Sequence, residues 1–341
     1  MRFSDIFKRI PSSTPPLPEA PPSASGPLAV PAQTPTPSKE PPASPSAHLE
    51  VAQQALEVVR RVKQAILQEQ PIPLPELKQS AEELVGAVIQ SPASFVEFAL
   101  TPSQEDFSLL HSIHTGILTV ILGNGARYTT DRLNQVTLAA LLHDVGMLKV
   151  LSLITQPRKL TLSELQEVRK YPLYTGELLE SMPDLPRMVA VVGTQANERV
   201  DGTGYPAGLS DGAIIEEARL VGLASVFESL THPRPYRIGL TALNALKLIT
   251  GDLRGSFDPQ FVKLLIEHVG FYPKGSWVEL SRGEQGRVVE FHPGFPLRPV
   301  VEVIRDLYGQ PYPQPKRIDL KNQPTLYITK DFGMAPPTKG S

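Results

Sequence analysis

The sequence predicts a mainly α-helical protein: a helical bundle with a small C-terminal antiparallel β subdomain and a disordered, proline-rich N-terminus. Apolar residues recur every three or four positions through residues 47–270, which is the spacing of amphipathic helices. Short β-rich runs separated by Gly, Pro and Asn follow in residues 271–335. Residues 11–46 hold thirteen of the 36 prolines, a density that neither a helix nor a central strand can sustain.

Length and composition restrict the class of protein. The chain of 341 residues suggests two or three domains, and its 41% hydrophobic content suits ordinary globular cores. A net charge of −2 gives no reason to expect DNA or RNA binding. The absence of cysteine excludes disulfides, thiolate metal sites and a cysteine nucleophile. Because we find no apolar run near the ~18 residues that span a bilayer, and no secretory signal, we expect a cytoplasmic protein.

The first 46 residues divide into a short peptide and a tether. Residues 1–10 place Phe3, Ile6, Phe7 and Ile10 at helical spacing, with the basic residues off that stripe. Residues 11–46 are expected to form a disordered, partly polyproline II tether. The peptide is either a frayed terminus or a docking element for a partner or a membrane surface. As a docking element it would recruit the protein to a membrane-associated or polar site.

The helical part is expected to have two sections. Residues 47–100 form an N-terminal helical segment that caps the following domain or pairs between subunits. Residues 101–270 form a domain of about seven helices, one of which opens with a capping box, Thr161-Leu-Ser-Glu164. The other six are expected at residues 107–122, 132–143, 188–196, 216–230, 241–250 and 259–269.

Residues 271–335 are expected to form a small antiparallel sheet packed against the bundle. Gly283-Glu-Gln-Gly286 is typical of a hairpin turn. The tail after Thr329 is expected to be loose. The predicted strands cover residues 276–280, 286–291, 299–304 and 325–329.

Three motifs carry the functional signal. The first is a loop, Asn197-Glu-Arg-Val-Asp-Gly-Thr-Gly-Tyr-Pro206, whose glycines permit positive φ or close backbone approach. The second is His143-Asp144 at the end of an apolar helix, and the third is Arg234-Pro-Tyr-Arg237. An adjacent His-Asp pair can place a carboxylate between two cations, which clamp a phosphate and lower the pKa of a bridging water.

In this order and at these separations, the motifs resemble the HD-GYP family of bacterial signalling phosphodiesterases, part of the HD superfamily of metal-dependent phosphohydrolases. The resemblance covers residues 105 to about 335. It implies an HD-type helical domain that binds two or three iron or manganese ions and hydrolyses cyclic di-GMP to pGpG or GMP. It also implies that Arg234 and Arg237 bind phosphate, for which guanidinium groups are suited. The implied interaction loop for GGDEF partners comprises Glu198, Asp201, Gly202, Gly204, Tyr205 and Pro206.

The metal positions that this resemblance assigns are only partly kept. His111, His143 and Asp144 match ligands of the family, and Glu228 is a further candidate one turn beyond a replaced aspartate. The family's lysine after the His-Asp-x-Gly sequence and its optional extra glutamate fall at Met147 and Phe107. Four other ligand positions hold side chains that are poor ligands for iron or manganese, or no ligand at all: Tyr171, Ala196, Asn197 and Ser225.

This pattern predicts a catalytically degenerate HD-GYP protein, a pseudoenzyme of bacterial signal transduction. It would act as a cyclic di-GMP-related binding or protein-interaction module. The expected cofactor is either none or one weakly bound iron or manganese ion, and not a full two-metal site. The alternative is a weak metal-dependent cyclic di-GMP phosphodiesterase that uses the reduced site. Without metal, His111 and His143 would be satisfied core histidines, and Asp144 would be the buried partner of one of them.

Overall fold

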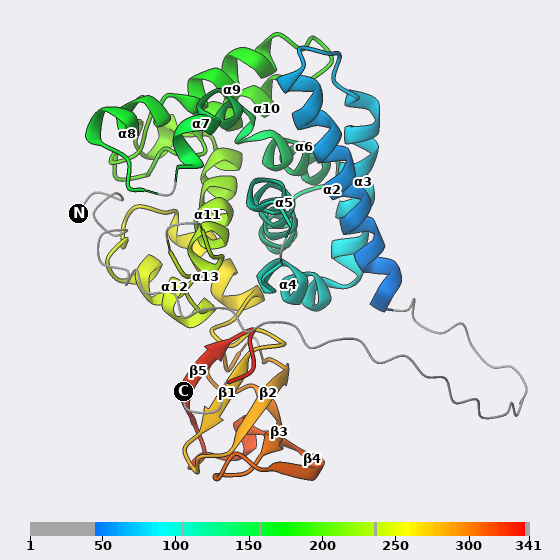
Figure 1. Cartoon of the computed structure of the whole chain (residues 1–341), viewed down its shortest axis with the longest axis vertical. Helices are drawn as coiled ribbons and strands as arrows, with labels where there is room; N and C mark the ends of the chain where they lie inside the picture. Colours follow the sequence, from blue (N-terminus) through cyan, green and yellow to red (C-terminus); the bar gives the residue numbers. More distant parts are fainter. Residues whose placement is uncertain (1–44, 104, 157, 235–236, 293, 338–341) are drawn as a thin grey trace, which may run out of the picture.

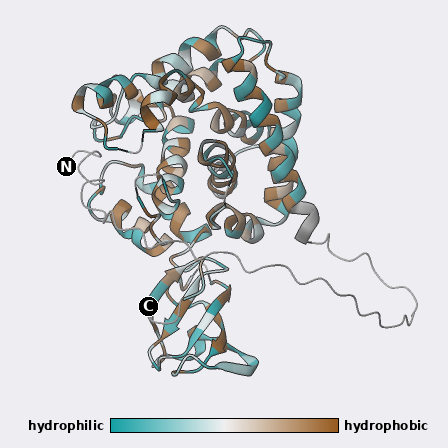
Figure 2. Ribbon diagram, viewed as in Figure 1, coloured by the Kyte–Doolittle hydropathy of each residue, from teal (hydrophilic) through white to brown (hydrophobic). Residues whose placement is uncertain are grey.

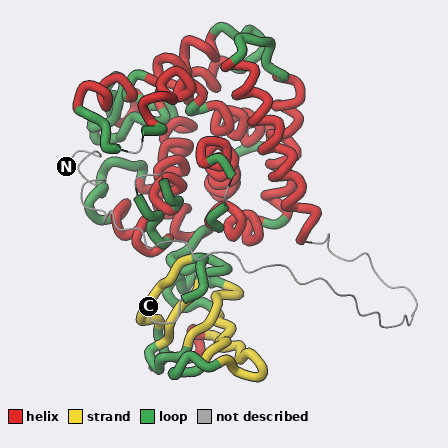
Figure 3. The backbone as a smooth tube through the Cα atoms, viewed as in Figure 1, coloured by secondary structure: helices red, strands yellow, loops and turns green. Residues whose placement is uncertain are grey.

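The computed structural model describes residues 45–103, 105–156, 158–234, 237–292 and 294–337. A helical domain comes first, and a small sheet follows at one end of it (Figures 1 and 3). The mainly α fold with a C-terminal antiparallel sheet is therefore confirmed. The predicted docking peptide and nearly all of the predicted tether lie outside the described residues.

Three N-terminal helices pack on the domain that follows them: α2 (Pro45–Leu67), α3 (Leu74–Gln90) and α4 (Pro92–Leu100). Prolines stand in the first turns of α3 and α4, where the missing N–H costs no helical hydrogen bond. Most buried apolar residues of these three helices belong to the same hydrophobic cluster as the rest of the helical domain. These helices are thus part of one core.

Helix α5 (Phe107–Gly125) is the centre of the domain. It contacts α2, α3 and α4 as well as three helices from later in the chain, and it is surrounded in Figure 1. Such a helix is apolar on nearly all sides, as Figure 2 shows. By length and composition alone, Phe107–Gly125 and Thr130–Ile154 could cross a membrane. The prediction that the chain has no apolar run near ~18 residues is therefore wrong. In the protein, 78% and 61% of these stretches are buried.

The described part of residues 101–270 contains nine α-helices, two more than expected. The capping box at Thr161 is confirmed, and the additional helices are the four-residue α7 and α9, which begins at Tyr171. Beyond α5, the elements are α6 (Thr130–Leu142), η1 (Val145–Val150), α7 (Leu151–Ile154), α8 (Leu162–Val168), α9 (Tyr171–Glu180), α10 (Arg187–Gln195), η2 (Asp211–Ala213), α11 (Glu216–Thr231), α12 (Ala242–Thr250) and α13 (Pro259–His268).

The sheet has five strands in the order β4-β3-β2-β1-β5, and every neighbouring pair is antiparallel. Its buried valines and leucines form a second, smaller hydrophobic cluster. The strands are β1 (Trp277–Leu280), β2 (Gln285–Glu290), β3 (Val300–Arg305), β4 (Pro311–Asp319) and β5 (Ile328–Gly333), with η3 (Leu320–Asn322) after β4.

Both edges of this sheet differ from the expectation. Strand β4 was not predicted, because Pro311, Pro313 and Pro315 argue against a strand. It pairs with β3 alone, so the missing N–H groups fall on a sheet edge, where proline is tolerated. The expectation of a loose tail after Thr329 is wrong, because β5 continues to Gly333 and pairs with β1.

Candidate functional site

The predicted His-Asp pair lies where α6 gives way to η1. Nδ1 of His143 donates to the backbone carbonyl of Ala140 at 2.7 Å, which leaves Nε2 as an acceptor 3.2 Å from Oγ of Ser225. The same hydroxyl lies 3.3 Å from Nε2 of His111, on α5. Burial lowers the pKa of His143 to about 4, so its ring is neutral near pH 7. Two predicted ligand histidines therefore meet through the hydroxyl that replaces the family's aspartate.

A lysine from the N-terminal helices reaches the aspartate of this pair. Nζ of Lys63, on α2, lies 3.5 Å from Oδ1 of Asp144 and donates to the carbonyl of Ser108 at 2.8 Å. Ser112 donates to the same carboxylate oxygen at 3.1 Å. Both charged side chains are only 7% exposed. Burial would raise the pKa of Asp144, but opposing interactions, of which the charge of Lys63 is the largest, outweigh burial and lower this pKa to about 2. The carboxylate is ionised, and its counter-charge is an ammonium group of the chain itself.

Three further positions that the resemblance assigns to histidine hold uncharged side chains that offer no imidazole to a metal: Tyr171, Ala196 and Asn197. Nδ2 of Asn197 donates to the hydroxyl of Tyr171 at 2.7 Å, and the Tyr171 ring meets that of Tyr205 edge-on with centroids 6.4 Å apart. Burial raises the pKa of Tyr171 well above its ordinary value, so the phenol stays protonated. Ala196 is buried at the end of α10 and offers no ligand atom.

Glu228 is the second buried carboxylate of the site. It projects from α11; its Oε2 contacts Nδ1 of His111 and accepts a hydrogen bond of 2.7 Å from Nη2 of Arg234. Burial would raise the pKa of Glu228, but the charges of His111 and Arg234 hold it well below its usual range. The guanidinium of Arg234 also lies 5.3 Å from the centroid of the Phe107 ring. In this structure Arg234, the predicted phosphate ligand, is the counter-ion of Glu228.

The other predicted phosphate ligand is also engaged within the protein. Arg237 is buried and donates to the backbone carbonyls of Ser229 and Leu230, at 3.2 Å for Leu230. These two bonds fix the chain that follows α11. Its predicted role in phosphate binding stays a prediction.

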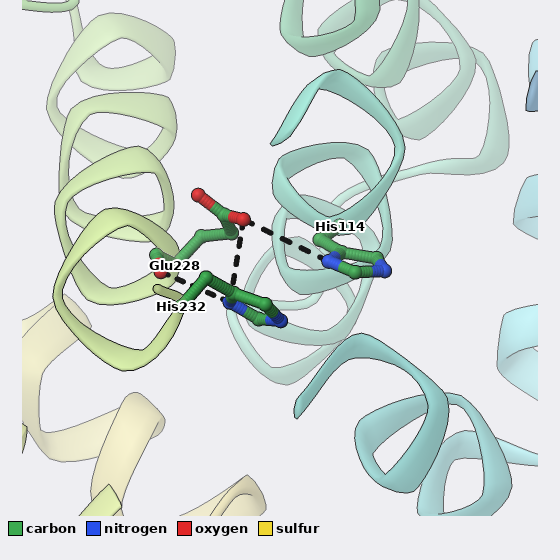
Figure 4. A group of neighbouring side chains, drawn as sticks. All are labelled: His114, Glu228 and His232. Carbon is green, nitrogen blue, oxygen red and sulfur yellow. Dashed lines mark hydrogen bonds and ion pairs between the residues drawn. The ribbon is translucent and has the colours of Figure 1, made fainter. Parts of the chain in front are cut away.

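The other oxygen of Glu228 meets two histidines that the sequence did not single out as ligands. Oε1 lies 3.7 Å from Nδ1 of His114 and 3.3 Å from Nδ1 of His232. Figure 4 shows His114 approaching from α5, whereas Glu228 and His232 both belong to the α11 side. The ligand atoms of the three residues lie within 4.8 Å of one another, and all three side chains are buried. We call these residues the His114 cluster.

The predicted interaction loop is held rigidly from inside. The buried carboxylate of Glu198 accepts the backbone N–H of Ala207 at 2.7 Å and that of Leu209 at 3.0 Å. Gly204 is required, because a Cβ there would lie 2.4 Å from Cα of Glu198. These contacts form the base of the loop, and the residues beyond them reach the surface.

The outer part of the loop is braced by Asp201. Its Oδ1 accepts the backbone N–H of Thr203 at 3.0 Å, and its Oδ2 accepts the hydroxyl of Ser256 at 2.7 Å. Gly202 takes φ +75°, which favours glycine. Tyr205 and Pro206 are half-buried, while Asp201 and Thr203 are exposed. The loop thus presents a fixed surface to solvent.

These side chains do not fit a two-metal centre of the family's kind. A metal at Asp144 would have to displace an ammonium group 3.5 Å from that carboxylate. A second metal would find a phenol, an alanine, an amide and a hydroxyl where imidazoles and a carboxylate are needed. The poor ligand atoms at the replaced positions and the Lys63 ammonium beside Asp144 both argue against a two-metal centre.

Comparison with known proteins finds similarity in both the helical domain and the C-terminal sheet. A family model described as an HD domain matches residues 115–261, and one described as a KOW domain associated with HD domain matches residues 277–334. The chain is 30% identical over 224 residues to the cyclic di-GMP phosphodiesterase PA4108 of Pseudomonas aeruginosa, covering 65% of this chain and 54% of that protein. It is 28% identical over 212 residues to the cyclic di-GMP phosphodiesterase PdeB of Borreliella burgdorferi, covering 62% of this chain and 56% of that protein.

A solved structure has the same fold. Bd1817, an HDG"Y"P protein from Bdellovibrio bacteriovorus, superposes with a TM-score of 0.56 at 18% identity, over 65% of this chain and 71% of that one. The chain therefore contains an HD domain and is similar in sequence to these cyclic di-GMP phosphodiesterases. The chain spans just over half of the length of the two phosphodiesterases named above.

Three residues of the site escaped the sequence analysis. Lys63 breaks the apolar stripe of its helix between Val59 and Ile66, and a lysine on such a stripe is a signal that was available. His232 follows Glu228 by four residues and so shares its helical face, but a helix end falls between them. His114 shares a face with His111, yet only the fold shows which α11 residues it meets.

Replacing Lys63 by methionine should destabilise the protein by about 3–5 kcal/mol, because Asp144 would keep a buried and uncompensated charge. Urea denaturation at pH 7 measures this change. Replacing both residues, by Lys63→Met and Asp144→Asn, should recover much of the loss.

Arg61 supplies a matched control on the same helix. Its pair with Glu76 is exposed on both sides, so Arg61→Met should cost less than about 1 kcal/mol. If Lys63→Met is as mild as this control, the buried pair does not neutralise Asp144.

Proposed function

We propose that this chain is a non-hydrolytic HD-GYP protein that serves cyclic di-GMP-related signalling as a protein-interaction module. The observation that carries the proposal is the Lys63 ammonium beside Asp144. It supplies a fixed positive charge next to the carboxylate that metals share in the family. Hydrolysis by this fold requires a metal-activated water and cations on the phosphate, and a lysine cannot lower the pKa of water as a metal does.

The Gly-Tyr-Pro loop supports the interaction role. Its shape depends on Glu198, Asp201 and Gly204, and none of these needs a metal. A surface that is already ordered loses little conformational entropy when a partner binds. By the resemblance, the partners of such a loop are GGDEF proteins. Cyclic di-GMP is the candidate small-molecule ligand, and its phosphates would have to compete with Glu228 for Arg234.

The second candidate is a weak metal-dependent cyclic di-GMP phosphodiesterase. The names of the curated relatives favour it. His111 contacts Glu228, and its ring centroid lies 5.1 Å from that of His143, so one ion would have to be held among these side chains. Activity would require that this ion bind despite Lys63 and Arg234, and that it act without a second metal.

Incubation with cyclic di-GMP and excess Mn²⁺ should give no pGpG or GMP, because one of the two metals has no adequate ligands. Chromatography of the products tests this expectation, with the Pseudomonas aeruginosa relative assayed alongside as a positive control. A metal-dependent turnover of ~1 per second or more would favour the second candidate and overturn the first.

Restoring the family's ligands should restore metal binding. We expect Tyr171→His, Ala196→His, Asn197→His and Ser225→Asp, combined with Lys63→Met, to raise manganese content well above that of the parent. The same four substitutions with Lys63 retained should gain less, because the ammonium opposes an adjacent dication. Metal analysis after gel filtration measures both.

The fold must be checked in parallel, since a histidine at buried Ala196 can cost ~1–3 kcal/mol through overpacking. If the five-substitution variant folds but holds no more metal than the parent, the assignment of these positions is wrong. Equal metal content with and without Lys63 would show that the ammonium group does not oppose metal binding.

A further inference from the structure

The His114 cluster contains polar atoms that the fold leaves without partners. Among the described residues, neither Nδ1 of His114 nor Oε1 of Glu228 has a hydrogen-bond partner, although both are fully buried. Their separation of 3.7 Å is too long for a hydrogen bond. Buried polar groups are almost always satisfied, so a pair of orphans that face each other calls for a third atom between them.

The spacing of the cluster matches the needs of a small cation. Two ligand atoms that each lie ~2.0–2.2 Å from a tetrahedral zinc ion are about 3.3–3.6 Å apart. Oε1 of Glu228 is 3.3 Å from one histidine nitrogen and 3.7 Å from the other. Two imidazoles and one carboxylate also form a ligand set that divalent transition metals take in proteins.

The surroundings hold the ligands in place. Arg234 and His111 both engage Oε2 of Glu228, which directs Oε1 toward the two histidines. The His114 ring lies tilted against the His232 ring with centroids 4.8 Å apart, and the Phe98 ring meets the His114 ring edge-on with centroids 5.4 Å apart. The ligand atoms are therefore fixed from two sides before any ion binds.

A shared proton is the other way to fill the gap. Nδ1 of His232 lies 3.1 Å from the backbone carbonyl of Glu228, 3.3 Å from Oγ1 of Thr231 and 3.3 Å from Oε1. A proton on that nitrogen would satisfy Nδ1 of His232, but it would leave Nδ1 of His114 without a partner. A metal ion gives a partner to Nδ1 of His114, Oε1 of Glu228 and Nδ1 of His232 together, while Nε2 of His232 has no hydrogen-bond partner among the described residues.

We propose that His114, Glu228 and His232 form a buried site for a single divalent transition ion, with zinc as the best match to the ligands. The site uses neither His143 nor Asp144 of the His-Asp pair, although it shares Glu228 with the reduced site considered above. It holds an ion inside the core, where water access is restricted, and its role is to join α5 to the end of α11. The proposal does not depend on whether the domain hydrolyses cyclic dinucleotides.

Metal analysis of full-length protein tests the proposal. After treatment with EDTA, reloading with Zn²⁺ and extensive dialysis, the parent should retain about one equivalent of zinc. His114→Gln and His232→Gln should each retain less than a tenth of an equivalent. The matched control is His143→Gln, which alters a buried histidine of the same domain outside the cluster and should retain the parent's zinc.

A second readout protects the test against misfolding. Zn²⁺ should raise the thermal midpoint of the parent and of His143→Gln, because binding to the native state alone stabilises it. It should leave the midpoints of the two cluster variants unchanged, and far-ultraviolet circular dichroism shows whether they fold. A parent that retains no zinc, or zinc lost through His143→Gln and kept in the cluster variants, would overturn the proposal.

Discussion

Two ionised carboxylates are buried at the centre of this helical domain, and each needs a positive charge close by. An isolated buried charge costs several kcal/mol, so neutralisation is a condition of folding. Lys63 neutralises Asp144 from α2, and Arg234 neutralises Glu228 from the segment after α11. The first pair ties the N-terminal helices to the centre of the domain. The second pair ties Arg234, which lies just beyond α11, to that helix. The helices must therefore pack in an arrangement that also brings each cation next to its carboxylate.

Cations of the chain itself lie beside both buried carboxylates of this domain. In a metal-dependent hydrolase the carboxylates are left for ions that arrive from solution. Here the strongest charges are already paired, and the remaining family positions carry the neutral Tyr171–Asn197 hydrogen bond and a serine shared by two histidines. The Gly-Tyr-Pro loop keeps its shape because its own carboxylates, Glu198 and Asp201, hold it. The order of this loop therefore does not depend on a metal at the His-Asp pair.

The sequence predicts this fold well where the pattern is local. Helical periodicity and the Thr161 capping box predict most helices, and β-rich runs predict four of the five strands. Strand β4 escaped because proline normally argues against strands, and only the sheet order shows that it lies at an edge. The resemblance named His111, His143 and Asp144, and the structure brings the two histidines together. It could not name Lys63, because the contact joins residues 81 positions apart, one on α2 and one between α6 and η1, which meet only in the folded core. The predictions for residues 1–44 stay predictions.

The central claim is that a lysine of this chain occupies the place where the family positions metal. Anomalous X-ray diffraction from crystals grown with excess Mn²⁺ tests it most directly, since manganese is located by its own signal and the lysine by electron density. The account predicts no anomalous peak within coordinating distance of Asp144, with Nζ of Lys63 beside that carboxylate. A manganese peak shared by His143 and Asp144, with Lys63 turned away, would contradict it.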